Sequence, residues 1–346
     1  MRLLVLGGTR FLGRHVVDAA LRRGHEVATF TRGLSGRPPE GVLALHGDRD
    51  DAPSLAAALD GAAAGSGWRP DVVVDTSCQT RAAAEQAAAA LADVRAYALV
   101  SSLNAYATWP PGPVPTDDDP TWPAEPAEGV DPGAYGPVKA HAERVLTAAV
   151  RGPVLLARAG LVAGPHDDVG RLAWWLRRLA RGGRVVVPGS GALAQPVALV
   201  DARDLADWLV RGVEEGWSGG VNATAPVGTT TLGGLLRTCA DVVGAGAELV
   251  EVPEEELLAA GVEPWTQLPY WLPREVAATA WDVATPRAQE TGLVHRSVGE
   301  TVADTWAWLQ TADQDVDLRS DRPAPGLPDE LEHDLLVAGA ATRGAR

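Results

Sequence analysis

Lysine is almost absent from this chain of 346 residues. Lys139 is the only one, and every other residue among the 30 Lys and Arg is arginine. Arginine therefore serves wherever a generic surface cation is needed. A lone lysine indicates a position where arginine cannot replace it, because the two cations differ in shape, hydration and tunability. Lys139 is the first candidate for a functional residue.

Cysteine and long hydrophobic runs are also scarce. The two cysteines, Cys78 and Cys239, fall in different predicted elements, which fits a reducing compartment better than a disulfide framework. No apolar run approaches the roughly 20 residues of a membrane span, and the N-terminal run enters a glycine turn at once, unlike a signal peptide. We therefore expect a cytoplasmic protein without a membrane partner.

Basic charge is in deficit as well. The formal net charge is −15 and the isoelectric point is about 4.9, which argues against nucleic acid and anionic membranes as main partners. The length is sufficient for a large core, in one α/β unit or in two lobes. A small-molecule partner remains, and the sequence shows no metal-ligand pattern.

The N-terminal residues follow the order strand, glycine turn, helix, strand. Residues 2–6 predict a short buried strand, a helical pattern runs from residue 11 to about 23, and residues 26–31 predict the next strand. The N–H groups of such a turn and of the following helix N-terminus receive a pyrophosphate. The candidate cofactor-binding residues of the turn are Gly7, Thr9, Arg10, Phe11, Leu12 and Gly13.

The end of the second strand bears on which cofactor binds. An acidic residue at this place would bind the ribose 2′-hydroxyl of NAD, but the sequence has Thr31-Arg32-Gly33 without a carboxylate. An arginine can hold a 2′-phosphate. Arg32 therefore favours NADP(H) over NAD(H), with an exposed strand-end arginine as the alternative.

Polar residues follow three further predicted strands. Asp48 and Arg49 come after the third strand, Thr76 and Ser77 after the fourth, and Ser102 after the fifth. Ligands of a doubly wound sheet bind outside the carboxyl ends of its strands. We expect the first four residues to contact the cofactor, although Asp48 also fits a turn cap, and the Ser102 hydroxyl to contact a substrate oxygen.

Tyr135 precedes the lone lysine by four positions. In a helix over residues 135–150, positions i and i+4 lie on one face, so the phenol and the ammonium can point into the same cleft. The ammonium and the helix N-terminus both favour the phenolate. Tyr135 is therefore a candidate general acid and base, and an exposed helical pair is the alternative.

The strand–helix alternation predicts a Rossmann-type doubly wound parallel sheet with a smaller C-terminal α/β substrate lobe. We expect a dinucleotide-binding domain over residues 1–160, with a proline-rich substrate-side loop at 103–134, and a substrate lobe over 161–312. Residues 313–346 are expected to form a peripheral tail. The aromatic segment 264–273 suits either a pocket wall or buried packing.

Taken together, these motifs resemble those of the extended short-chain dehydrogenase/reductase family, the NAD-dependent epimerase/dehydratase-like enzymes. The resemblance covers about residues 2–310 and includes the glycine turn, Ser102 ahead of Tyr106, and Tyr135-x-x-x-Lys139. It implies that Tyr135 transfers the proton at the substrate oxygen, that Lys139 holds the nicotinamide ribose, and that Ser102 orients the substrate. It also implies a homodimer through the helices near 81–92 and 135–150.

Three residues depart from the usual family pattern. Arg10 replaces the middle glycine of the turn, as in an atypical branch that includes RNA-binding relatives. Leu161 and Val197 stand where nucleotide-sugar enzymes often carry asparagine and arginine, which favours a more apolar substrate. The leading hypothesis is an NADP(H)-dependent oxidoreductase. The alternatives are an epimerase or dehydratase that uses NAD(P) transiently, and a non-catalytic dinucleotide-sensing or RNA-binding relative, which the acidic charge and the intact Tyr135/Lys139 pair disfavour.

Overall fold

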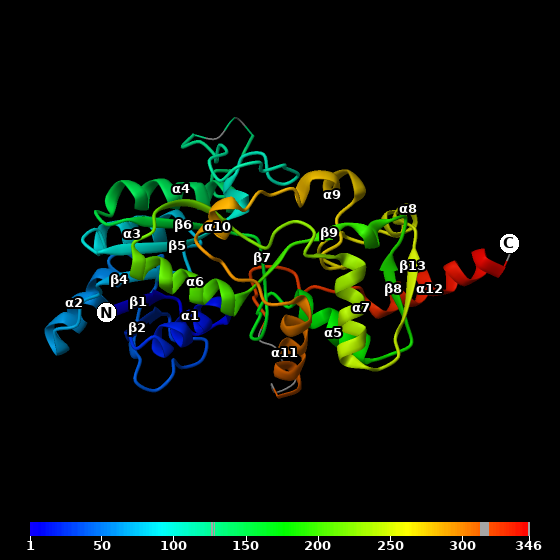
Figure 1. Cartoon of the computed structure of the whole chain (residues 1–346), viewed down its shortest axis with the longest axis horizontal. Coiled ribbons are helices and arrows are strands. Elements are labelled where there is room, and N and C mark those ends of the chain that lie inside the picture. The colour runs from blue at the N-terminus through cyan, green and yellow to red at the C-terminus, as the bar shows by residue number, and fades with distance from the viewer. Residues whose placement is uncertain (126, 128, 312–317, 345–346) are drawn as a thin grey trace. The chain divides into compact units, whose positions relative to one another are not determined.

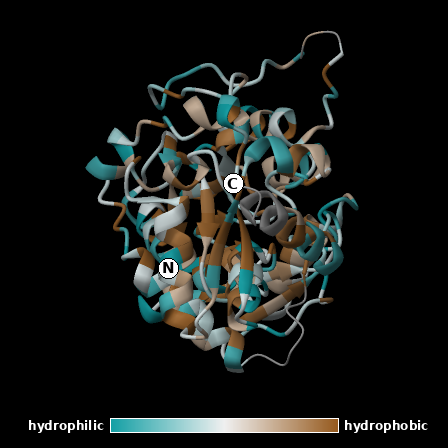
Figure 2. Cartoon of the chain, turned by 90° about the vertical axis from the view of Figure 1, so that its right-hand side faces the viewer, coloured by the Kyte–Doolittle hydropathy of each residue, from teal (hydrophilic) through white to brown (hydrophobic). Residues whose placement is uncertain are grey.

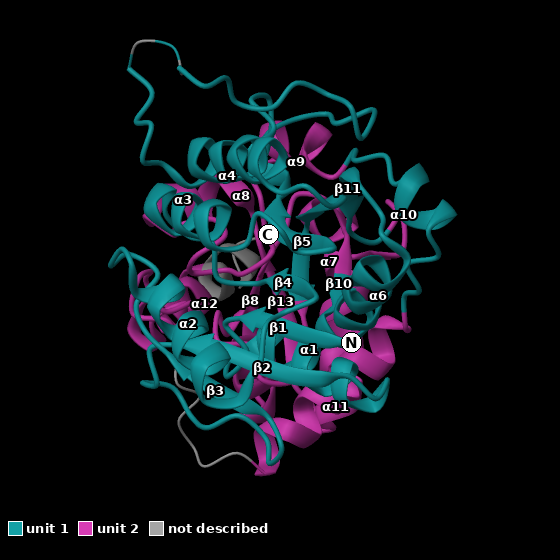
Figure 3. Cartoon of the chain, turned by 90° about the vertical axis from the view of Figure 1, so that its left-hand side faces the viewer, with its two compact units in different colours: residues 1–162, 200–225, 282–295 teal, residues 163–199, 226–281, 296–346 magenta. Residues whose placement is uncertain are grey.

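The computed structural model describes residues 1–311 and 318–344, except residues 126 and 128. The chain divides into two compact units (Figure 3). Unit 1 comprises residues 1–162, 200–225 and 282–295, and unit 2 comprises residues 163–199, 226–281 and 296–346. This differs from the expected division at residue 160 into consecutive domains, because two later segments of the chain return to unit 1.

A seven-stranded parallel sheet forms the centre of unit 1 (Figure 1). Its order is β11-β6-β5-β4-β1-β2-β3, so the chain reverses direction across the sheet between β1 and β4. This confirms the predicted Rossmann-type fold. The strands are β1 (Arg2–Leu6), β2 (Glu26–Thr31), β3 (Leu43–His46), β4 (Val72–Asp75), β5 (Ala96–Ser102), β6 (Val154–Ala159) and β11 (Gly219–Ala223).

Helices cover both faces of this sheet. Alternate residues of β1 enter different cores: Leu3 and Val5 pack with one set of helices, Leu4 and Leu6 with the other. The continuous apolar strands follow from this burial on both faces. The first set of helices is α1 (Phe11–Arg22) and α6 (Ala202–Glu215), and the second is α2 (Ser54–Ser66), α3 (Arg81–Ala90) and α4 (Tyr135–Ala149).

The strand β11 is absent from the sequence-based expectations. It begins with two glycines, which disfavour strands, so its sequence carries little β signal. In the structure it pairs in parallel with β6, and Asn222 lies opposite Arg158. The short helix α10 (Pro286–Glu290) buries Ala288 in the same core as β11.

The proline-rich loop after β5 is anchored to unit 1 along much of its length. It starts with the 3₁₀ helix η1 (Leu103–Ala105), and Tyr106 forms an isolated bridge with Thr121. Farther along, Val114 bridges to Val283. The side chains of Tyr106, Val114 and Val283 form a small hydrophobic cluster.

Unit 2 is smaller and mixed in structure. Helices α5, α7 and α11 pack on one another, and β8 pairs in parallel with β13. The remaining elements of the chain are β7 (Leu161–Ala163), α5 (Arg171–Ala180), β8 (Arg184–Pro188), η2 (Ala192–Ala194), β9 (Pro196–Val197), β10 (Leu199–Asp201), β12 (Thr230–Thr231), α7 (Leu232–Val243), β13 (Glu248–Val252), α8 (Glu254–Ala259), α9 (Arg274–Ala280), α11 (Val298–Thr311) and α12 (Asp329–Gly344).

The C-terminal tail is not peripheral in its described part, which corrects the expectation. Glu332 of α12 is buried, and its carboxylate accepts hydrogen bonds from Arg178 Nε at 2.6 Å and from the Val186 backbone N–H at 3.1 Å. Within the aromatic segment 264–273, Tyr270 and Trp271 are buried, as the packing alternative requires.

Hydrophobic residues concentrate in the strands and in the inner faces of the helices, and hydrophilic residues dominate the loops (Figure 2). Among the described helices, none has both the length and the apolar character that crossing a bilayer would require.

Candidate active site

The glycine turn of unit 1 lies at the point where the sheet order reverses, between β1 and β4. A Cβ built on Gly7 would lie 2.5 Å from Thr76 Oγ1, and one on Gly13 would lie 2.6 Å from the Gly8 nitrogen. The glycine turn is therefore packed closely against Thr76 and the first turn of α1, which leaves room for no side chain at Gly7 or Gly13. Such a close-packed turn before a helix N-terminus fits a bound pyrophosphate.

The residues after β2 face the turn. The Thr9 and Ser35 hydroxyl oxygens lie 3.4 Å apart, so the loop after β2 folds back toward the glycine turn. Arg32 is exposed, and within the described chain its guanidinium has no carboxylate within 4.0 Å. Arg10 occupies the N-cap position of α1. Arg32 follows directly on the last residue of β2, Thr31.

Arg49 differs from its predicted role. Its guanidinium donates to both Asp75 carboxylate oxygens, at 2.7 and 2.9 Å, and to the Ser77 hydroxyl and the Ala83 carbonyl. Burial raises the pKa of Asp75, but the charge and hydrogen bonds of Arg49 outweigh it and lower that pKa overall. The hydrogen bonds of Arg49 join the loop after β3 to Asp75 and Ser77 at the end of β4 and to Ala83 of α3. Its guanidinium is therefore engaged within the protein and not directed at a cofactor.

Asp48 and Ser77 keep accessible surface beside this pair. The Asp48 carboxylate accepts from the Asp50 backbone N–H at 2.9 Å, as in a capped turn. The Ser77 backbone N–H donates to Asp75. Both residues are half-buried at the carboxyl edge of the sheet, which is compatible with the predicted cofactor contact.

Lys139 is buried and held in place by two hydrogen bonds. Its side chain is only 2% exposed, and the Nζ donates to the Cys78 carbonyl at 2.8 Å and to the Val100 carbonyl at 3.1 Å. No carboxylate of the described residues lies within 4.0 Å of it. A buried ammonium usually has an ionic partner, whereas that of Lys139 is held by two backbone carbonyls.

Tyr135 lies next to Lys139, and Ser102 is on the strand whose Val100 carbonyl accepts from Lys139. Tyr135 is the first residue of α4 and is 45% exposed, and the Lys139 Nζ lies 5.5 Å from the centre of its ring. Ser102 is the last residue of β5, two residues after Val100. The structure therefore brings the three predicted catalytic residues to one edge of the sheet, near Thr76 and the glycine turn.

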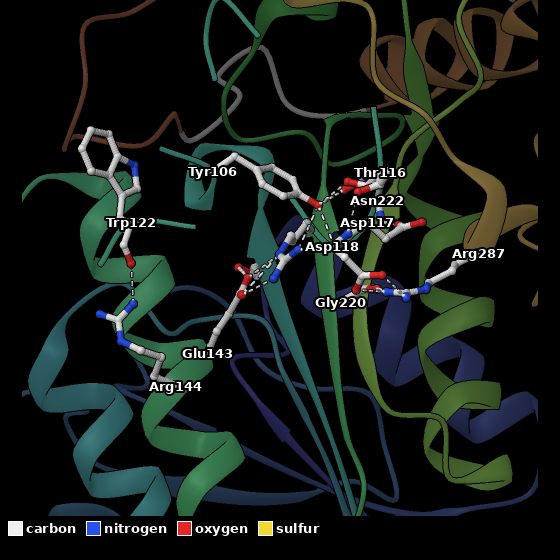
Figure 4. Close-up of polar contacts among 12 residues, drawn as sticks. Tyr106, Thr116, Asp117, Asp118, Trp122, Glu143, Arg144, Gly220, Asn222 and Arg287 are labelled. Carbon is white, nitrogen blue, oxygen red and sulfur yellow. Dashed lines mark hydrogen bonds and ion pairs between the residues drawn. The ribbon is translucent and has the colours of Figure 1, made fainter. Parts of the chain in front are cut away.

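A buried polar network extends from α4 into the loop and β11 (Figure 4). Glu143, one turn after Lys139, accepts from the Arg158 guanidinium at 2.7–3.2 Å and from the Ser101 hydroxyl. Arg158 Nη1 also donates to the Tyr106 hydroxyl and to the Asp117 carbonyl, both at 2.8 Å. Burial lowers the pKa of Arg158, but Glu143 more than offsets it and raises the pKa overall.

The network continues to β11 through Asn222. The Tyr106 hydroxyl donates to Asn222 Oδ1 at 2.7 Å, and the Asn222 backbone N–H donates to the Asp117 carboxylate at 2.6 Å. Burial raises the pKa of Tyr106 to about 12, so this phenol stays protonated at neutral pH. Arg158, together with Tyr106, thus joins α4, the loop and β11 within unit 1.

Sequence reasoning missed most of this network. A signal existed for Glu143, because Tyr135, Lys139 and Glu143 are spaced by four and share one helix face. Asn222 had no such signal, since its strand was not predicted. The Cys78 and Val100 carbonyls are backbone groups and carry no sequence signature.

Comparisons with known proteins agree with this architecture. A model of the NAD-dependent epimerase/dehydratase family matches residues 3–224. The 2′-dehydrokanamycin reductase of Streptomyces kanamyceticus is 32% identical over 201 residues, which are 56% of this chain and 53% of that protein. The isoflavone reductase homolog IRL of Zea mays is 39% identical over 72 residues, 18% of this chain and 23% of that protein. The chain thus spans about half and about a quarter of the length of these relatives.

Solved structures resemble the chain over nearly its whole length. The Bordetella bronchiseptica enzyme WbmH, crystallised with NAD⁺, has a TM-score of 0.64 at 17% identity over 89% of this chain and 98% of that chain. The UDP-glucose 4-epimerase of Thermotoga maritima, crystallised with UDP-glucose, has a TM-score of 0.60 at 19% identity over 90% and 99%. At such identities the likeness shows the fold. The family match over residues 3–224 shows that this chain belongs to the NAD-dependent epimerase/dehydratase family of extended short-chain dehydrogenase/reductase enzymes.

Proposed function

We propose that this protein is an NADP(H)-dependent oxidoreductase that interconverts a carbonyl and an alcohol on a small, fairly apolar molecule. The observation that carries the proposal is the buried Lys139 ammonium, held by the Cys78 and Val100 carbonyls beside the exposed Tyr135 phenol. Burying an ammonium without a carboxylate partner costs folding free energy. The stability of the fold therefore does not account for this lysine.

Each residue has a distinct role in the proposed reaction. When bound, NADPH supplies the hydride that a carbonyl carbon requires. Tyr135 gives a proton to the carbonyl oxygen, as a positioned general acid. Lys139 favours the phenolate that remains, because an opposite charge nearby stabilises it, and Ser102 orients the oxygen. In the reverse direction the Tyr135 phenolate takes the proton from the alcohol.

Lys139 also has capacity left to hold the cofactor. An ammonium has three N–H donors, and two of them bond to the Cys78 and Val100 carbonyls. The third is available for a ribose hydroxyl. This supports the assignment of Lys139 to both the phenol and the nicotinamide ribose.

The preference for NADP(H) rests on Arg32. The residue is exposed just after β2, and no carboxylate stands at this strand end to receive a ribose 2′-hydroxyl. A guanidinium can bind a 2′-phosphate by charge-assisted hydrogen bonds. Thr9, Thr76 and the glycine turn complete the proposed cofactor contacts.

An oxidoreductase is favoured by the two curated relatives, both of which are named as reductases. The second candidate is an epimerase that returns the hydride to its substrate, and the structural likeness to UDP-glucose 4-epimerases favours it. The absence of the family's phosphate-binding arginine at Val197 counts against a nucleotide sugar. A homodimer and a cytoplasmic location remain proposals from the sequence.

Net consumption of cofactor separates the two candidates. We expect NADPH to be oxidised in proportion to added carbonyl compound, in assays with the small apolar carbonyls 4-nitrobenzaldehyde and cyclohexanone. Tyr135→Phe should retain NADPH binding while turnover falls by about 10²–10⁴-fold. Conversion of UDP-glucose without any change in the cofactor pool would contradict the proposal and favour the epimerase.

A further inference from the structure

Ser102 receives hydrogen bonds from Asn104 at both of its acceptor positions. The Asn104 backbone N–H and the Asn104 Nδ2 each lie 3.2 Å from Ser102 Oγ. A serine hydroxyl has two acceptor lone pairs and one donor. With both lone pairs occupied, the only interaction that the Ser102 hydroxyl has left to make is to donate its proton.

Asn104 is itself held firmly. The backbone carbonyl of Asn104 accepts a hydrogen bond from the Trp122 indole Nε1 at 3.0 Å. A Cβ on Gly136 would lie 2.3 Å from the same carbonyl and 2.7 Å from the Trp122 Nε1. Asn104 therefore packs against the first turn of α4, next to Tyr135, and Trp122 of the loop fixes it there. Arg144 in turn donates to the Trp122 carbonyl at 2.5 Å.

We propose that Asn104 is a positioning residue that fixes Ser102 as a hydrogen-bond donor to the substrate oxygen. Ser102 then cannot take a proton from the substrate, and proton transfer is left to Tyr135. This inference rests on the proposed function and deepens it. In this arrangement Ser102 only donates a hydrogen bond to the substrate oxygen, and Tyr135 transfers the proton.

Two variants of Asn104 separate this role from a structural one. Asn104→Leu is close in shape but lacks the Nδ2 donor, so Ser102 keeps only the backbone N–H. Asn104→Asp replaces the donor by an acceptor when it is ionised. The Ser102 proton then turns toward the Asp carboxylate and away from the substrate.

The expected loss of kcat differs between Asn104→Leu and Asn104→Asp. Asn104→Leu should reduce kcat by about 2- to 10-fold, as the loss of one ordinary hydrogen bond does. Asn104→Asp at pH 8 should reduce kcat by about 10²–10³-fold, the usual effect of losing one donor to a transition-state oxyanion. KM should change less than kcat, because the donor acts most strongly on the developing charge.

The pH dependence of Asn104→Asp provides a readout that a structural defect would not give. A protonated Asp can again donate to Ser102 Oγ. The ratio of variant to wild-type kcat should therefore rise as the pH falls from 8 toward 5 and the carboxylate becomes protonated. NADPH oxidation with 4-nitrobenzaldehyde measures this ratio, and the thermal shift induced by NADPH verifies that each variant folds and binds cofactor.

The outcomes are distinguishable. An Asn104→Asp variant with wild-type kcat at pH 8, or with a deficit that does not change with pH, would overturn the inference while Tyr135→Phe still tests the function. If Asn104→Asp does not fold, the kcat of Asn104→Leu tests the inference. A wild-type kcat in Asn104→Leu would overturn it. If the wild type turns over none of the carbonyl probes, the proposed function fails and the inference fails with it.

Discussion

Glu143→Gln should destabilise unit 1, because it removes the charge that faces the buried Arg158 guanidinium. Glu143 and Arg158 are 4% and 7% exposed, and three hydrogen bonds of 2.7–3.2 Å join them. Removing one partner of such a pair costs about 3–5 kcal/mol. Glutamine keeps one acceptor for Arg158, so we expect the low end, about 3 kcal/mol. For a unit of this size that lowers Tm by about 6–12 °C.

Unit 2 contains a matched control. Glu332 and Arg178 are likewise 4% and 7% exposed, and Arg178 Nε lies 2.6 Å from the Glu332 carboxylate. Glu332→Gln should therefore cost a similar free energy of unfolding. It should leave the affinity for NADPH unchanged, whereas Glu143→Gln should also lower turnover, because Glu143 shares its helix face with Tyr135 and Lys139.

Urea unfolding followed by tryptophan fluorescence measures both losses. The double variant Glu143→Gln/Arg158→Met removes the uncompensated guanidinium and should recover part of the stability lost in the single variant. A loss below about 1 kcal/mol in Glu143→Gln, or a double variant that is less stable than the sum of both single losses predicts, would refute this reasoning.

Three further outcomes are expected. Lys139→Arg should lower NADPH affinity and turnover together, whereas the exposed Arg69→Lys should change neither; equal turnover in the two variants would leave Lys139 as a structural cation. Arg32→Ala should reduce the preference for NADPH over NADH by about 10- to 150-fold, as loss of one charge-assisted hydrogen bond does, and fluorescence titration of both cofactors measures it. Burial raises the pKa of Asp167 to about 6 from its ordinary 3.8. The folded state then binds more protons between these values, so stability falls as pH rises through this range. Asp167→Asn should abolish that dependence and add up to about 3 kcal/mol above pH 6, which urea unfolding at pH 4 and pH 8 tests.

Local patterns determined much of unit 1. The strand β1, the glycine turn and α1 follow one another within residues 2–22, so hydrophobic periodicity and glycine placement were sufficient to predict them. The strand β2 has the predicted bounds for the same reason. Tyr135 and Lys139 lie on one helix, where a spacing of four decides that they share a face.

The tertiary structure alone decided what these residues touch. Lys139 bonds to carbonyls 61 and 39 positions away, and backbone carbonyls have no side chain to mark them in a sequence. Tyr106 bonds to Asn222 at a separation of 116 residues, and Asn222 lies on a strand that begins with two glycines and is stabilised by long-range pairing and packing. Arg49 illustrates the same limit, because its position after β3 suggested a cofactor contact. Its burial against Asp75 depends on β4 lying in the sheet beside β1, a long-range arrangement that no local pattern encodes.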